Sequence, residues 1–554
     1  MPKRRMLAKL LLMAGACLVG ISVVGATLRG RPAVEPPHDV EAPYSSADFE
    51  STLAVINSQL ARMAADAGLT PTAPADSLTI AKRISLAMVG SGMAFEEVRA
   101  LQAVPETQRV RWWTARVLAD RRWADYFAQR LSRAYVGTAD GPFLLFRRRK
   151  FNAWIAERLA KDAGYNQIVH SMISAEGLWT DTPQVNFVTA TMDEANEGRG
   201  DPIRLAGRTS RAFLAQRMDC LQCHDDFLDK LNFGTEQEPV LGDQEQFHSL
   251  AAFYSGTAAK NPFQGIAEDQ TKYRFEFLGE SEKREVEAAV PFHRELLPTE
   301  GKPRKRLADW VTHPQNRAFS RAAVNRVWAL MFSRPLVEPV DDIPVDADVP
   351  EVLDVLADDF VAHGFSIQRL IRLIIQSDAF QRDSRGDFEV TEAHEDCWAV
   401  FPISQLRPEQ VAGSVLQACS LTALDSTSSI FIQLKVFGDT QDFLKNFGDR
   451  GEDEFDVDSV TIAQRLIMMN GNLIAERTKV DLVANAATRI AAMVRGDTEA
   501  VEATFLAVMN RLPTTAELQQ FAQYLSEKKG NQRSQAIGDL YWALMNSTEF
   551  SWNH

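Results

Sequence analysis

Apolar residues recur every three or four positions along most of the 554-residue chain, which is the spacing of helices that bury one face. The first such segment begins at Ser45 and stops before Gly68. Its apolar positions are Leu53, Ile56, Leu60, Met63 and Ala67. A glycine directly after the last apolar position is a common helix stop, so the segment predicts one complete helix.

The next predicted helix follows Asp76, a favourable N-cap residue, and runs to Met88. Helical spacing then continues with short interruptions to Ala175. Aromatic residues fall on the apolar positions of this region, and we interpret them as core: Trp112, Trp113, Trp123, Tyr126, Phe127 and Trp154. Two further helices are predicted over 203–219 and 244–254.

Alternation of apolar and polar residues, which is typical of a strand, is clearest within 271–292, around Tyr273, Phe275 and Phe277. Helical spacing returns after residue 303. Residues that favour helix starts mark this second region: Asn316, Pro350, Pro408 and Pro513. The predicted fold class is mainly α, with two helical domains joined by a small β element.

This reading divides the chain into five parts. They are a signal peptide or membrane anchor (1–30), a Pro-rich tether and helix (31–75), a helical domain (76–262), a β linker (263–303) and a C-terminal helical domain (304–554). The sequence shows no internal repeat.

The N-terminus predicts export. Basic residues precede an uncharged run from Leu10 to Leu28, which is long enough for a signal-peptide core or for one membrane span. Positive charge before such a run keeps the N-terminus in the cytoplasm and moves the rest of the chain across the membrane. We therefore expect a periplasmic or cell-surface protein, either released after cleavage or anchored to the inner membrane by this segment.

The net charge is −14, which argues against nucleic acid as a partner. Two basic clusters, 147–150 and 302–306, are interpreted as solvated helix ends or linkers. The sequence motifs of common hydrolases and nucleotide-binding enzymes are absent. Whether the protein is an enzyme stays open at this point.

The chain has five cysteines, and two of them belong to the motif Cys220-Leu221-Gln222-Cys223-His224. C-x-x-C-H is the attachment signature of covalent c-type haem, in which both thiols bind the porphyrin and the histidine binds iron. The nearest downstream histidine in the same domain is His248, a candidate sixth iron ligand. The competing interpretation of His248 is a histidine on an amphipathic helix.

Three other fates of the two thiols remain open: a disulfide between them, a metal site, or free thiols. A disulfide needs no histidine, and a thioredoxin-like β-α-β context is absent. A zinc site usually has a second Cys or His pair at short spacing, which the chain lacks. Cys397 and Cys419 either form one disulfide or stay free.

A second group of polar residues lies in the C-terminal region. Arg321, Asn325 and Trp328 share one face of a predicted helix. Arg326 and the pair Asp341-Asp342 are near in sequence. The group predicts either a polar binding site with carboxylates for acid–base chemistry or an ion network that holds two helices together.

Several stretches resemble the paired planctomycete cytochrome-type domains, domain of unknown function 1549 followed by domain of unknown function 1553. The first resemblance rests on 95–99, 174–177, 209–214, 219–225 and 250–254. The second rests on 306–310, 325–328, 336–342 and 544–550. Together they cover roughly residues 75–554 and make 76–262 the cytochrome-type helical domain.

The resemblance implies an exported, mostly helical protein with a cytochrome-like motif. The family commonly reads C-H-D-H-P at the motif, whereas Asp226 and Phe227 stand here in place of the second histidine and the proline. If that histidine binds a metal in relatives, this chain has lost or replaced the ligand.

The motif and the resemblance together predict a monohaem c-type cytochrome-like module for redox chemistry or electron transfer, with covalent haem c at Cys220, Cys223 and His224. The alternative is a non-haem extracytoplasmic binding or structural protein with a C-x-x-C disulfide. The expected partners are a redox protein in the first case and a surface polymer in the second. We expect the N-terminal segment to associate the protein with the membrane.

Overall fold

The computed structural model describes residues 40–554 apart from 139–145, 193–197, 228–230, 235–236, 260–263, 346–347, 449–454 and 456–460. Helices dominate these residues, and the strands within them form short two-stranded antiparallel sheets. The mainly α prediction is therefore confirmed. The predicted export segment, 1–30, lies outside the described residues.

The N-terminal half of the described chain begins with helices that match the apolar spacing of the sequence. They are α2 (Ala47–Asp66), α3 (Ser77–Val89), α4 (Phe95–Gln102), α5 (Arg109–Leu118), α6 (Arg121–Val136), α7 (Arg148–Ala160), α8 (Tyr165–Ser174) and α9 (Asn186–Thr189). Asp76 caps α3 as predicted, because its side chain accepts hydrogen bonds from the backbone N–H groups of Leu78 and Thr79. None of the helices among the described residues is long and apolar enough to span a bilayer.

Three elements surround the C-x-x-C-H motif: α10 (Pro202–Leu214), the 3₁₀ helix η5 (Met218–Gln222) and α11 (Gln244–Ala252). Asp201 caps α10 by accepting from the N–H groups of Ile203 and Arg204. α11 falls where the sequence predicts it, whereas α10 ends at Leu214, five residues before the predicted end at 219, because Ala215 adopts the left-handed conformation. The remaining 3₁₀ helices are η1 (Ala42–Tyr44), η2 (Glu106–Gln108), η3 (Pro183–Val185), η6 (Arg294–Leu296) and η7 (Glu549–Ser551).

The strands are only two or three residues long. β1 (Thr257–Ala259) pairs with β2 (Ile266–Glu268), β3 (Arg274–Phe275) with β4 (Arg284–Glu285), and β5 (Ser404–Gln405) with β6 (Trp552–Asn553). The strand expected within 271–292 is thus a small hairpin rather than one long strand. Its alternating aromatic residues pack against α11, and this packing, rather than ladder hydrogen bonds, holds the segment.

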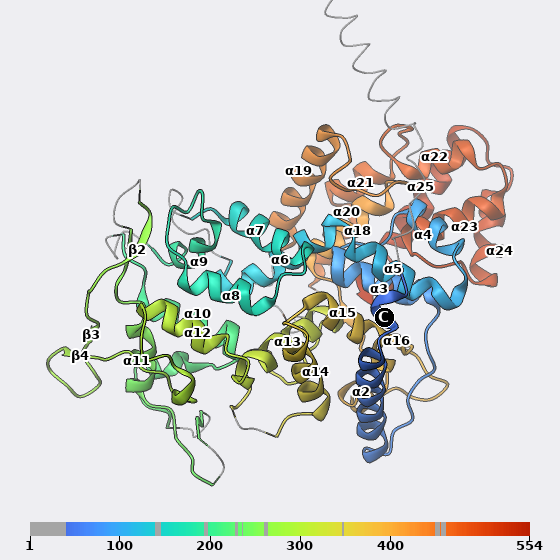
Figure 1. Ribbon diagram of the computed structural model, residues 1–554. Helices are drawn as coiled ribbons and strands as arrows, with labels where there is room; N and C mark the ends of the chain where they lie inside the picture. Colours follow the sequence, from blue (N-terminus) through green and yellow to red (C-terminus); the bar gives the residue numbers. More distant parts are fainter. Residues whose placement is uncertain are drawn as a thin grey trace, which may run out of the picture.

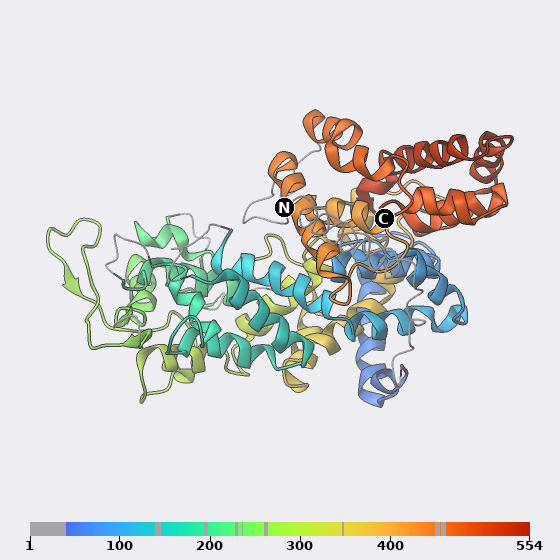
Figure 2. The ribbon, with the colours of Figure 1, turned by 90° about the horizontal axis from the view of Figure 1, so that it is seen from above.

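The rest of the chain is helical again. The helices are α12 (Pro303–Val311), α13 (Arg317–Phe332), α14 (Glu351–Ala362), α15 (Ile367–Gln376), α16 (Asp378–Gln381), α17 (Glu392–Asp396), α18 (Pro408–Ala418), α19 (Ile430–Phe447), α20 (Ile462–Asn470), α21 (Asn472–Thr478), α22 (Ala486–Met493), α23 (Asp497–Val508), α24 (Thr515–Leu525) and α25 (Asn531–Met545). Figures 1 and 2 place α10 and α11 at one end of the molecule and α22–α25 at the other.

The hydrophobic cores divide the chain at a different place from the sequence pattern. Apart from Leu506, one core collects buried side chains from Tyr44 to Phe401, and it includes residues on both sides of the boundary expected at 303 and 304. A second core runs from Leu406 to Phe550 and takes in Leu86. The central helix α13 explains this difference, because every residue from Ala318 to Phe332 is buried and the helix contacts α3, α10, α14 and α15.

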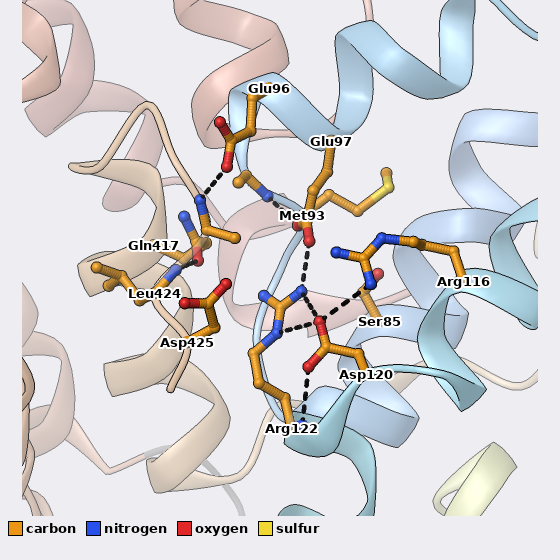
Figure 3. A network of polar contacts seen from close by, with 12 residues as sticks. Ser85, Met93, Glu96, Glu97, Arg116, Asp120, Arg122, Gln417, Leu424 and Asp425 are labelled. Carbon is orange, nitrogen blue, oxygen red and sulfur yellow. Dashed lines mark hydrogen bonds and ion pairs between the residues drawn. The ribbon is translucent and has the colours of Figure 1, made fainter. Parts of the chain in front are cut away.

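A network of polar contacts ties α4 to α6 and to the loop that follows α18 (Figure 3). Arg122 lies between Glu97 of α4 and Asp120, the N-cap of α6, and pairs with both carboxylates. The neighbouring Glu96 accepts a hydrogen bond from the N–H of Ala423, at 2.7 Å, in the loop that follows α18. The network therefore fixes α4 between the two cores.

Replacing Arg122 by Met is expected to destabilise the protein strongly. The carboxylates of Glu97 and Asp120 would stay buried without their cation, and breaking a buried pair in this way costs about 3–5 kcal/mol. The matched control is Arg121→Met, which removes a half-exposed pair with Asp125 worth about 0.2–1 kcal/mol. Urea unfolding followed by circular dichroism measures both, and equal midpoints for the two variants would contradict the role of the network.

Candidate functional site

The C-x-x-C-H motif forms a tight turn at the end of η5. The carbonyl of Cys220 accepts hydrogen bonds from the N–H groups of Cys223, at 3.2 Å, and His224, at 3.4 Å. Met218 and Leu221 are buried in the first core, whereas both thiols are exposed and free. The alternation of anchored and exposed residues presents the two sulfur atoms at the surface.

His224 is held in one tautomer by its own backbone. Its Nδ1 lies 2.6 Å from the carbonyl oxygen of Asp225, and a carbonyl only accepts, so Nδ1 carries the proton. In the neutral ring, Nε2 then keeps the lone pair that a metal-binding imidazole requires. Phe227 stacks on the ring with centroids 5.3 Å apart.

His248 supports the backbone of the motif through a hydrogen bond. Its Nε2 donates to the carbonyl oxygen of Gln222, between the two cysteines, at 3.1 Å, and the side chain of Gln244 donates to the same oxygen at 3.1 Å. Its Nδ1 accepts from the hydroxyl of Tyr273 at 2.9 Å. The ring is fully buried and lies on Phe275 with centroids 3.5 Å apart.

This environment bears directly on the candidate sixth ligand. Both nitrogens of His248 are engaged, so coordination of iron by His248 would break one of its hydrogen bonds. Burial lowers the pKa of His248 and keeps the ring neutral. In the sequence, His248 was a candidate ligand because it lies close to the motif along the chain. The alternating aromatic residues at 273–277 are the signal that this histidine, on the helix against which they pack, is enclosed.

Exposed apolar side chains gather around the motif. Phe227 and Leu278 are more than two-thirds exposed, and Val240 and Leu241 are also exposed. Two hydrogen bonds connect their segments to the motif and its support: the N–H of Asp226 donates to the carbonyl of Gly242, and the N–H of Leu278 donates to the side chain of Gln244. Clustered apolar surface of this kind marks a place where a cofactor or a partner binds.

The other cysteines lie elsewhere. Cys397 ends α17 and Cys419 ends α18, and both are free thiols. Cys419 belongs to the second core, and burial raises the pKa of its thiol to about 12. In the described part of the chain, no three His, Cys, Asp or Glu side chains are grouped so that they could hold a metal ion.

A cavity of about 780 Å³ adjoins the motif, and Asp219 and Gln222 form part of its wall. Among the described residues, the lining also includes parts of α6, α10, the C-terminal half of α13, the loop that follows α13, α17 and the β5–β6 pair. Seven of the described arginines and five acidic residues face this space. Only Asp341 and Arg326 of these belong to the polar group singled out in the sequence.

Comparison with known families matches residues 55–257 to PSCyt2, Protein of unknown function (DUF1549), and residues 303–435 to PSD1, Protein of unknown function (DUF1553). The order is the one that the sequence motifs predict. The chain belongs to the family that pairs these two domains. Neither a curated protein nor a solved structure matches it.

Within the DUF1553 domain, the predicted polar group divides into two sets. Arg321 donates to both oxygens of Asp354, at 2.8 and 2.9 Å, and thereby joins α13 to α14. Asn325 donates to and accepts from the backbone of Val337, and Trp328 is fully buried. Arg321, Asn325 and Trp328 therefore hold elements of the fold together and do not form a binding site.

Arg326 and Asp341 face the cavity, and Asp341 connects the two domains. Asp341 of the DUF1553 domain is paired with Arg211 and Arg217 of the DUF1549 domain. Burial opposes its ionisation, but the two guanidinium groups hold the pKa of Asp341 below its usual value. Asp342 closes the neighbouring turn through its N–H to Pro339.

Replacing His248 by Phe is expected to loosen the C-x-x-C-H turn. The variant keeps an aromatic ring but loses the hydrogen bonds to Gln222 and Tyr273, each worth about 0.5–1.5 kcal/mol. We expect Cys220 and Cys223 to react several-fold faster with a maleimide at neutral pH. His363→Phe, a change in a half-exposed histidine of the DUF1553 domain, serves as the control. Unchanged labelling rates would show that His248 does not hold the turn.

The turn is also expected to open as the pH falls. The pKa of His248 is lowered from 6.5 in the closed structure, so the opened turn binds the proton more readily. The stability that His248 contributes is complete above pH 6.5 and is lost as the pH falls from 6.5 towards the lowered pKa. Hydrogen exchange of residues 218–226, corrected for intrinsic rates, measures this loss. His248→Phe is expected to remove the pH dependence.

Proposed function

We propose that this chain is an exported c-type cytochrome-like redox protein that carries one haem at Cys220 and Cys223. The observation that carries the proposal is the state of His224. Its Nδ1 donates to Asp225 and leaves Nε2 as the ligand atom, directly after two exposed free thiols. This is the donor set that covalent haem attachment requires.

The surrounding residues fit such a group. Cys220 and Cys223 would hold it through thioether bonds, and His224 would be its axial ligand. Phe227, Leu241 and Leu278 supply exposed apolar surface beside the thiols. When bound, haem supplies one-electron transfer; the chain itself fixes the turn through Gln244 and His248 and orients the imidazole through Asp225.

The N-terminal segment supports a periplasmic or cell-surface location, where haem of this type is attached. The segment either remains as a membrane anchor or is cleaved after export. The partner that we propose is a redox protein that docks on the apolar rim of Phe227, Val240, Leu241 and Leu278, since electron transfer needs close approach to the motif. The net charge of −14 makes nucleic acid an unsuitable partner.

The alternative is a non-haem extracytoplasmic binding or structural protein in which Cys220 and Cys223 form a disulfide. The arginine-lined cavity beside the motif favours this second candidate, since binding a surface polymer or another ligand needs no haem. The two proposals differ in the fate of the thiols, which a single experiment can follow.

Co-expression with a cytochrome c maturation system is expected to give a haem-stained band on a denaturing gel. The band should disappear in Cys220→Ala/Cys223→Ala, because no thiol remains to form a thioether. Cys397→Ala/Cys419→Ala is the matched control and should keep the stain, because these thiols lie elsewhere in the fold. A colourless wild-type protein with a Cys220–Cys223 disulfide would exclude haem and favour the binding protein.

His224→Ala is expected to keep stainable haem and to lose the absorption spectrum of a histidine-ligated iron, because sulfur attachment survives while the axial ligand is gone. His313→Ala, in the loop after α12, is the control and should leave the spectrum unchanged. Asp226→His restores the histidine found in relatives. A changed spectrum in that variant would mean that position 226 reaches the iron. An unchanged spectrum in His224→Ala would exclude the ligand assignment.

A further inference from the structure

The hairpin of β3 and β4 lies beside α11 at one end of the molecule (Figure 1) and has an exposed apolar tip. The N–H of Glu280 donates to the carbonyl of Phe277 at 3.0 Å, and Gly279 has a φ of +88°, which closes a tight turn. Leu278, at the second position of this turn, is 71% exposed. Each strand of the hairpin pairs through only two residues. A hairpin of this size is marginally stable by itself, so its position depends on its anchors.

One face of α11 anchors the body of the hairpin. The ring of Phe275 stacks on His248, and Phe277 meets the same histidine edge-on with centroids 5.6 Å apart. Arg284 lies over the ring of Phe277 at 3.9 Å and pairs with Glu245 at 3.0 Å. Glu245 and His248 therefore hold the strands, and the tip depends on one further residue of the same helix.

Gln244, in the first turn of α11, holds the tip and is only 6% exposed. Its Oε1 accepts from the N–H of Leu278 at 3.0 Å, and its Nε2 donates to the carbonyl of Gln222 at 3.1 Å. Its backbone N–H donates to the carboxylate of Asp225 at 2.8 Å. A backbone N–H only donates and a carbonyl only accepts, so these partners fix the orientation of the amide. One buried side chain thus links the hairpin tip to the turn that carries both thiols.

We propose that Gln244 is a positioning residue of the haem site, whose amide couples the hairpin to the attachment turn and keeps Leu278 in a fixed place near the thiols. The purpose of this coupling rests on the proposed redox function. Leu278 belongs to neither hydrophobic core, and an exposed leucine is unfavourable in water unless a ligand or partner covers it. Apolar surface beside a haem excludes water, and solvent exposure helps to set its reduction potential.

The coupling is tested in the full chain without haem, by hydrogen exchange of residues 218–226 corrected for intrinsic rates. Leu278→Pro removes the N–H that donates to Gln244. Proline suits the second position of a turn with glycine at the third, so the hairpin is kept. We expect exchange in 218–226 to become at least about threefold faster, since the amide of Gln244 is released from one side. An unchanged rate would overturn the proposal, even if no other variant folds.

Gln244→Met keeps the length of the side chain and removes both of its hydrogen bonds. The effect on 218–226 should exceed that of Leu278→Pro, because the carbonyl of Gln222 then keeps only His248. The double variant Gln244→Met/Leu278→Pro is expected to exchange no faster than Gln244→Met alone, since both changes remove one shared contact. Rates that multiply would mean that the hairpin and the turn loosen independently, and would refute the coupling.

The matched control is Gln417→Met on α18. Gln417 is 2% exposed, accepts from the N–H of Leu424 at 3.0 Å and donates to the carbonyl of Thr422 at 3.0 Å, so the same kind of amide link is lost away from the motif. This variant should leave the exchange of 218–226 unchanged. Faster exchange in Gln417→Met would assign the effect to a general loss of stability and contradict a specific role of Gln244.

The haem-loaded protein tests the purpose of the coupling. Leu278→Ser keeps the backbone N–H and makes the tip polar. It should lower the reduction potential, because the oxidised haem carries more positive charge and gains more from water. Leu512→Ser, at a leucine that is 51% exposed elsewhere, is the control. An unchanged potential in Leu278→Ser would refute the role of the tip. A parent protein that attaches no haem would refute the proposed function, whereas the exchange rates decide the coupling itself.

Discussion

The burial of α13 from Ala318 to Phe332 is the constraint on which the arrangement of the two domains depends. A helix buried on every side cannot separate into a solvent-facing and a core-facing half, so its polar residues must find partners inside the protein. Arg321 finds Asp354, and Asn325 finds the backbone of Val337. Arg326, one position further along the helix, pairs with none of the described residues and borders the cavity.

The same physical rule organises the C-x-x-C-H turn. His248 is fully buried on α11, and it satisfies its two nitrogens by donating to Gln222 and accepting from Tyr273. The turn thus receives a fixed backbone from a residue outside the motif, while its thiols stay at the surface. A rigid support beneath exposed reactive groups is what a site for covalent attachment needs, since the reacting atoms must be accessible and their backbone must not move.

Local properties of the sequence predicted the helices well, because apolar spacing and caps such as Asp76 act within one element. The packing partner of each helix was less accessible, since spacing reports that a face is buried but not against which helix it packs. Arg321, Asn325 and Arg326 of α13 looked like one polar group in sequence, yet of these three only Arg326 borders the cavity. The role of His248 likewise depended on a hairpin whose aromatic residues come from another part of the chain.

The cavity also gives a physical reason for finding the two domains in one chain. Arg211 and Arg217 come from the DUF1549 domain, and the carboxylate of Asp341 that they share comes from the DUF1553 domain. Neither domain alone would bring the carboxylate of Asp341 to Arg211 and Arg217. Neither domain alone would enclose Arg326, because α10 and α13 both contribute to the lining of the same cavity. The charged interior thus holds the pair together through Asp341 and, at the same time, contains Arg326, which pairs with none of the described residues.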